Sequence, residues 1–195
     1  EAKGLQAKIA PTALAVDRLQ QDKAQEAMRH NLNQANRDSF VERMERERSD
    51  NPEAFEKADA LYSDGLKGLR ENQDPSALEE LVNTHPETNR GACGAIQLGQ
   101  HYLRHGQFDD ARRVFDVALE YGEGAYFKDG VEVAPQALFY QGVVASKEGR
   151  SHDAEELWTM VQARYPHAST HQGDALSQVI QDELLHLQRD EGNQP

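Results

Sequence analysis

Few residues in this chain have the type and spacing that metal binding or catalysis would need. His101 and His105 are four residues apart, so on a helix both imidazoles would lie on one face and could share a metal ion. Two ligands leave a zinc site unfilled, and the pair lacks a cysteine or the acidic residue of a His-Glu-x-x-His motif. We therefore expect neither a metal site nor a cofactor.

Cys93 is the only cysteine, which excludes an internal disulfide or a thiolate cluster. It lies near the expected start of a helix, where the helix dipole favours a reactive thiolate. The surrounding residues 91–95 are all Gly, Ala or Cys, which is typical of a small side chain in a close helix contact. We expect packing, and since no Ser/His/Asp set, nucleophile elbow or phosphate-binding glycine loop is found, we expect no catalytic residues and no enzyme activity.

The charge of the chain restricts its partners. It carries 21 basic and 34 acidic side chains, a formal net charge of −13, and all of this excess lies in residues 51–195. An acidic surface repels nucleic-acid phosphates and anionic lipids, so we expect no nucleic-acid partner and no peripheral membrane binding. The apolar stretches are far shorter than the ~20 residues that span a bilayer, so we expect no membrane insertion.

Residues 5–48 predict one long polar helix, because apolar residues recur at helical spacing. A heptad seam holds from Leu5 through Ile9, Thr12 and Val16 to Leu19 and then meets charged residues, so a coiled coil is poorly specified. The segment has a single aromatic residue and cannot form a core by itself. We expect residues 1–50 to form a helical N-terminal arm that docks on the rest of the chain, joins chains into a homo-oligomer through residues 5–48, or stays partly mobile.

The strongest signal is an internal repeat. Residues 92–121 and 135–165 superimpose at a constant offset of 43 positions, each with an apolar helix, a glycine turn, an acidic helix start and a second apolar helix. The matched pairs are Gly99 with Gly142, Gly106 with Gly149, Ala111 with Ala154, and Phe115 with Trp158. The small residues let the two helices of a hairpin approach closely, and the aromatic residues fill the gap to the next hairpin. Since one hairpin cannot bury its apolar face alone, the units must stack.

These residues, together with Leu98, Tyr102, Leu138 and Pro166, resemble the tetratricopeptide repeat family. The family repeat is about 34 residues long, so the longer offset implies an insertion, which we place at 122–134 and expect to be a small β-hairpin or an ordered loop. The resemblance implies an all-α fold, a short α-solenoid of helical hairpins in residues 51–195. Its expected parts are a degenerate repeat (53–88), two repeats (92–121 and 135–168) and a capping helix (172–188).

In this family the first helix of each unit lines a concave groove. The aligned positions here are Ile96, Gln100, Leu103, Arg104, Phe139, Val143, Ser146 and Lys147. Members that clamp the carboxylate of chaperone tails place Lys and Asn where this chain has Ile96, Gln100, Phe139 and Val143, so such a ligand is not expected. An apolar groove with Arg104 and Lys147 at one end suits a helical or extended peptide. The N-terminal arm or the terminal helix filling the groove is the alternative.

The sequence thus predicts a protein–protein interaction scaffold or adaptor, with a protein or peptide partner whose identity it does not give. The alternative is a structural protein, in which the arm assembles chains and the repeats only make them rigid. Paired units divided by proline-containing links are similar to those of envelope-associated bacterial repeat proteins, among them a periplasmic partner of the Tol–Pal system. This similarity implies a periplasmic or cell-envelope location, with the cytoplasm as the alternative.

Overall fold

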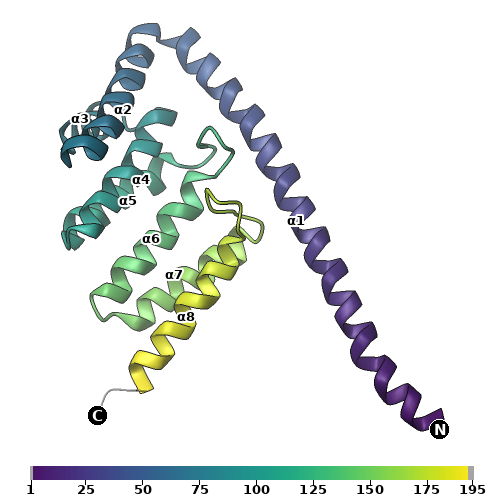
Figure 1. Ribbon diagram of the computed structural model, residues 1–195. Helices are drawn as coiled ribbons and strands as arrows, with labels where there is room; N and C mark the ends of the chain where they lie inside the picture. The colour runs from purple at the N-terminus through teal and green to yellow at the C-terminus, as the bar shows by residue number, and fades with distance from the viewer. Residues whose placement is uncertain (1, 193–195) are drawn as a thin grey trace.

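The computed structural model describes the backbone of residues 2–192 and the side chains of residues 15–189. The helices are α1 (Ala2–Asp50), α2 (Pro52–Asn72), α3 (Ser76–Thr84), α4 (Asn89–Arg104), α5 (Phe108–Tyr121), α6 (Val133–Lys147), α7 (Ser151–Arg164) and α8 (Leu176–Gly192) (Figure 1). No strand is found among the described residues, and the predicted all-α class is confirmed. Within the same residues, no helix combines the length and the apolar character that crossing a membrane would require.

Helices α2 to α7 form three hairpins that stack side by side, and α8 packs against α7 (Figure 1). Gly106 and Gly149 form the turns between the helices of the second and third hairpins, with φ angles of 71° and 75°. These left-handed angles favour glycine because it has no Cβ. In the first hairpin, which was predicted as degenerate, Gln73 takes the corresponding left-handed conformation with φ 56°.

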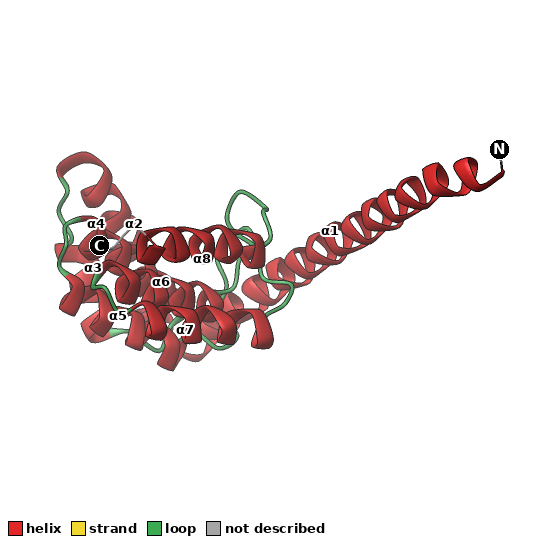
Figure 2. Cartoon of the chain, turned by 90° about the horizontal axis from the view of Figure 1, so that it is seen from below, coloured by secondary structure: helices red, strands yellow, loops and turns green. Residues whose placement is uncertain are grey.

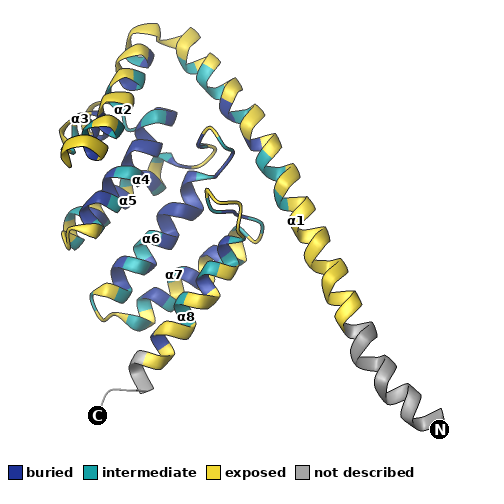
Figure 3. Ribbon diagram, in the orientation of Figure 1, coloured by how far each residue is buried: buried dark blue, intermediate teal, exposed yellow. Residues whose placement is uncertain are grey.

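Two glycines allow the close approach of helices within the second and third hairpins. A Cβ at Gly99 would lie 2.3 Å from Cε1 of Phe115, and a Cβ at Gly142 would lie 2.3 Å from Nε1 of Trp158. Both aromatic side chains are fully buried. One core cluster joins α2 to α6 and a second joins α6 to α8, which places the buried residues on the inner faces of the stack (Figure 3). The glycine–aromatic pairs therefore set the helix spacing that the repeat requires.

The segment between α5 and α6 belongs to the repeating unit. Residues 122–132 form an ordered loop with one antiparallel bridge, and residues 165–175 form the same loop after α7. The bridges join Tyr126 with Glu132 and Ser169 with Ala175, and the backbone hydrogen bonds of the two loops match at the 43-residue offset. The residues predicted as an insertion at 122–134 are thus a recurrent connection that turns each second helix back to the next first helix.

Helix α8 stands where the first helix of another unit would stand. It begins at Leu176, which corresponds to Val133 at the start of α6, and the expected helical residues 172–175 lie in the preceding loop. At the position of Gly99 and Gly142, α8 has Leu185, which is 49% exposed. A branched side chain there prevents a second helix from packing as closely as α5 and α7 do, so α8 can cap the stack.

Helix α1 lies along the edge of the stack formed by the loops and projects beyond it (Figures 1 and 2). It ends at Asp50, where the Asn51 side chain accepts a hydrogen bond from the backbone N–H of Ala54 (3.2 Å) and Pro52 starts α2. Residues 15–28 are exposed throughout. The side chains of Leu5, Ile9 and Thr12, which begin the heptad seam, lie outside the described residues.

Candidate protein-binding site

Helix α1 is attached by hydrogen bonds at the start of α4 and at the loops that precede α6 and α8. Glu47 accepts a hydrogen bond from the backbone N–H of Asn89 (2.9 Å) at the start of α4. Asn36 donates to the carbonyl of Gly130 (3.0 Å) in the loop before α6, and Asn33 donates to the Ser169 hydroxyl (2.8 Å) in the loop before α8. At 1.5 Å per residue, the contact points on α1 span about 20 Å, with about 16 Å between Glu47 and Asn36 and about 5 Å between Asn36 and Asn33.

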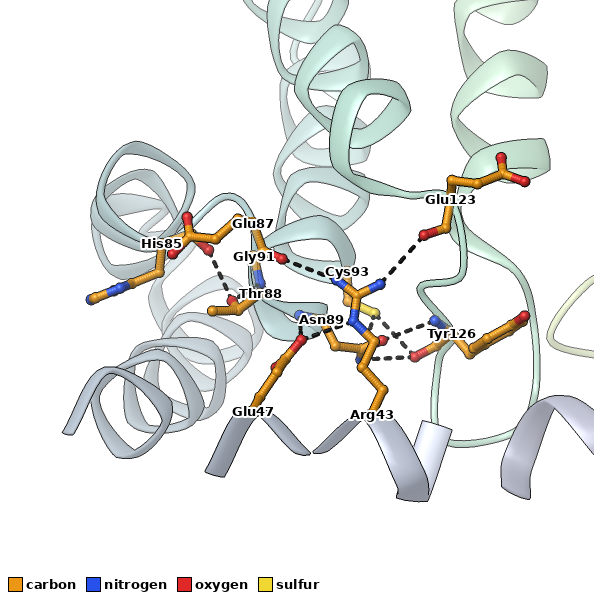
Figure 4. Close-up of polar contacts among 10 residues, drawn as sticks. All are labelled: Arg43, Glu47, His85, Glu87, Thr88, Asn89, Gly91, Cys93, Glu123 and Tyr126. Carbon is orange, nitrogen blue, oxygen red and sulfur yellow. Dashed lines mark hydrogen bonds and ion pairs between the residues drawn. The ribbon is translucent and has the colours of Figure 1, made fainter. Parts of the chain in front are cut away.

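Arg43 joins two of these units through one guanidinium group (Figure 4). Its Nε donates to a Glu47 carboxylate oxygen at 2.8 Å, and its terminal nitrogens donate to the carbonyls of Glu87 (3.0 Å) and Glu123 (3.4 Å). These carbonyls belong to the turn before α4 and to the loop before α6. The planar array of donors on arginine suits this role, since it can serve acceptors in several directions at once.

Asn89 and Cys93, both on α4, hold the α5–α6 loop in place beside the arm (Figure 4). The buried Asn89 amide donates to the Tyr126 carbonyl (3.0 Å) and accepts from the Tyr126 backbone N–H (3.0 Å). The Cys93 thiol donates to the same carbonyl at 3.5 Å. Burial raises the pKa of this thiol to about 12, so it is protonated at neutral pH and is not a nucleophile. This agrees with the interpretation of Cys93 as a packed side chain.

The predicted groove positions lie along the neighbouring helices α4 and α6, at different depths. Ile96 and Phe139 are buried in the core, so neither offers its side chain to a ligand. Gln100, Leu103, Val143 and Ser146 are half-buried, and Arg104 and Lys147 are exposed at the ends of their helices. The described hydrogen bonds of α1 reach only the opposite ends of the repeat helices and the loops. The six accessible residues form what we call the α4–α6 strip, which the arm leaves open at Arg104 and Lys147.

The two histidines on α4 lie together, with their ring centroids 4.3 Å apart. His101 is buried, its Nδ1 has no hydrogen-bond partner among the described residues, and burial lowers its pKa so that the ring is neutral at pH 7. Within the described residues, no group of three His, Cys, Asp or Glu side chains is close enough to hold a metal ion. The pair thus has no third ligand in that part of the chain.

An open cleft of about 590 Å³ lies between α1, α2, α4 and the tips of the two repeat loops. We call it the arm cleft; its lining includes Arg37, Tyr62, Leu66, Arg90, Phe127 and Lys128. Sequence analysis did not find it, because these residues come from four separate segments that meet only when α1 docks on the loops. Comparisons of the chain with protein-family models, with curated proteins and with solved structures found no match, so its function has to be inferred from its own geometry.

Proposed function

We propose that the protein is an interaction scaffold that binds a helical or extended peptide along the α4–α6 strip. The observation that supports this most is the repetition of accessible side chains on two neighbouring helices. Gln100, Leu103 and Arg104 recur as Val143, Ser146 and Lys147, 43 positions later. A strip with apolar and polar positions and two cations at one end suits a peptide that carries apolar side chains and an acidic end.

The stack favours peptide binding, because the two helices that carry the strip, α4 and α6, are already ordered in the absence of a ligand. Both helices are held by fully buried aromatic residues of the following helix, Phe115 and Trp158, so a ligand would not have to order them. A preorganised surface avoids the conformational cost that weakens binding to mobile segments. The glycine–aromatic pairs also support our proposal that the hairpins are of the tetratricopeptide type.

The test is a capture experiment on the native source with the full chain and with the double variant Arg104→Glu/Lys147→Glu. A captured partner is then purified and its dissociation constant is measured by calorimetry. We expect the variant to weaken binding by about tenfold or more, because both cations become repulsive to an acidic end. Its circular dichroism should stay unchanged, since both residues are exposed.

The control is the double variant Arg18→Glu/Lys23→Glu, which changes the net charge by the same amount at two exposed residues on the projecting part of α1, away from the strip. If the purified partner binds the strip variant as tightly as the unchanged chain, the strip is not its binding site. A partner lost equally with both variants would indicate general charge repulsion and would also contradict the proposal.

Assembly through the arm is a second candidate function. The projecting part of α1 exposes three large apolar side chains, Val16, Leu19 and Met28, at 49%, 54% and 52%. Burying such side chains between arms would stabilise an oligomer by about 1.5–3 kcal/mol for each side chain that becomes fully buried. Light scattering over a range of concentrations separates the two candidates, since a constant monomer mass leaves only the binding role.

The proposal includes no catalytic role, cofactor or nucleic-acid partner. The protonated Cys93 thiol argues against a nucleophile at this position, and the acidic charge of the repeats argues against nucleic acid. For location we propose the periplasm or the cell envelope, with the cytoplasm as the alternative. The similarity to envelope-associated repeat proteins supports this choice, and fractionation of native cells tests it.

A further inference from the structure

The arm cleft has an apolar wall. The half-buried side chains of Tyr62 and Leu66 form it from α2, and the buried Phe127 closes it from the loop before α6. The Phe127 ring meets the His171 ring edge to face, with the centroids 4.6 Å apart, so the tips of both repeat loops are packed against each other at the cleft. About 300–1,000 Å³ is typical of a pocket that holds a small ligand, so this cleft can take one or two bulky side chains.

The rim of the cleft is cationic in a chain whose net charge is −13. Arg90 is held by an ion pair with Asp59 (2.6 Å) and lies over the Tyr62 ring, 4.9 Å from its centroid. Arg37 donates from Nε to the backbone carbonyl of Asp129 (3.0 Å), and Lys128 is exposed at the loop tip. Among the described side chains, no carboxylate lies within ion-pair distance of Arg37 or Lys128.

The one acidic residue in the lining, Asp129, is already bonded within the protein. Its carboxylate lies 2.7 Å from Nδ1 of His171 and accepts a hydrogen bond from the backbone N–H of Val131 at 3.3 Å. The lining therefore keeps an excess of positive charge, since Arg37, Arg90 and Lys128 face this one carboxylate beside an apolar wall. This combination matches an anionic group next to a bulky apolar group.

We propose that the arm cleft binds an acidic peptide segment of a partner protein, with a bulky apolar side chain against Tyr62 and Leu66 and carboxylates paired with Arg37 and Lys128. The inference rests on the proposed function, that the chain is a binding module, and adds a second contact surface to it. A peptide fits better than a nucleic acid, because the acidic charge of the repeats repels a long polyanion. A short acidic segment interacts mainly with the nearby positive charges of Arg37 and Lys128, because salt screens charges that lie more than about 10 Å away.

The site is composite, because Arg37 belongs to α1 and the other contacts belong to α2 and the loops. It exists only while α1 is docked, so a bound peptide must stabilise the docked arm. By linkage, a ligand that binds only this state stabilises it further as its concentration exceeds the dissociation constant. Binding should therefore slow amide exchange in the docked part of α1, residues 29–50.

The experiment is a selection of short random peptides displayed on phage, with the full chain as bait. We expect the selected peptides to combine Asp or Glu with Phe, Trp or Leu. A labelled synthetic copy of the strongest binder is then titrated by fluorescence anisotropy. We expect Arg37→Glu/Lys128→Glu to weaken its binding by about tenfold or more and Arg104→Glu/Lys147→Glu to leave it unchanged.

Each other outcome is decisive. Peptides without net negative charge, or peptides that depend on Arg104 and Lys147 and not on Arg37 and Lys128, overturn the inference and leave the α4–α6 strip as the binding site. A selection that yields no binder to either surface overturns both proposals. If a short single-stranded DNA binds the chain through Arg37 and Lys128 more tightly than the peptide does, the assignment of a peptide ligand is wrong.

Discussion

Removing the indole of Trp158 should unfold the repeats at markedly lower denaturant concentration. The side chain is fully buried, its Nε1–H donates to the Phe139 carbonyl at 3.1 Å, and its ring fills the space beside Gly142. Replacing a buried Trp by Ala costs about 3–5 kcal/mol, because it loses apolar burial and leaves a cavity. The hydrogen bond accounts for about 1 kcal/mol of this. For a chain of this size we expect the melting temperature to fall by roughly 10 °C.

The assay is urea unfolding of the Trp158→Ala variant followed by far-ultraviolet circular dichroism. Fluorescence is unsuitable because Trp158 is the only tryptophan. The matched control is Met160→Ala on the same helix, where the side chain is 41% exposed and the expected loss is under about 0.5 kcal/mol. If Trp158→Ala lowers the free energy of unfolding by less than about 1 kcal/mol, the glycine–aromatic contact does not join the hairpin, and our explanation of the repeat fails.

Two further predictions concern the attachment of the arm and the buried thiol. Gly130 has φ 87° and a Cβ there would lie 2.1 Å from the Asn33 carbonyl oxygen, so Gly130→Ala should displace α1 and speed amide exchange along it. Gly124→Ala, also at positive φ (65°) but with nothing within 4 Å, should leave exchange in α1 unchanged, and equal effects of the two variants would contradict this reasoning. Cys93 should resist thiol reagents at about pH 8 until the chain is unfolded, and rapid labelling of the native chain would show that the thiol is not buried. Because its pKa rises from 9.0 to about 12 on folding, its contribution to stability is complete below pH 9 and is lost as the pH rises towards 12, which urea titrations across that range would measure.

Local spacing was enough to predict the hairpins, because close helix packing allows only small residues at the contact. Gly99 and Gly142 face aromatic rings at the same relative position. The 43-residue offset in the sequence therefore predicts the same helix contact in both hairpins. The recurrence of the loop was missed, because residues 126–128 and 169–171 share a backbone shape but have unlike side chains. Gly130 and Gly173, which both have positive φ and lie 43 positions apart, were the signal that could have identified it.

The candidate sites were less predictable because they depend on tertiary contacts. Helical periodicity placed Ile96 and Phe139 on the same face as the accessible positions, but only the packing of neighbouring helices determines that these two are buried. The arm cleft depends on where a polar helix docks. Asn33 and Asn36 fix that register through hydrogen bonds to a serine hydroxyl and a backbone carbonyl, and a polar residue in a helix sequence does not indicate its distant partner.

The attachment of α1 also has a mechanical consequence. A stack of helical hairpins can bend and twist like a spring, because each unit contacts only its neighbours. A continuous helix bonded at α4 and at the loops before α6 and α8 restricts this motion, because its constant rise per residue fixes the distances between the attachment points. Tension on the projecting end of α1 would reach the Ser169 contact first, then Gly130, and Asn89 last. Detachment of α1 that starts from its projecting end would therefore free the units one at a time, from α8 towards α4.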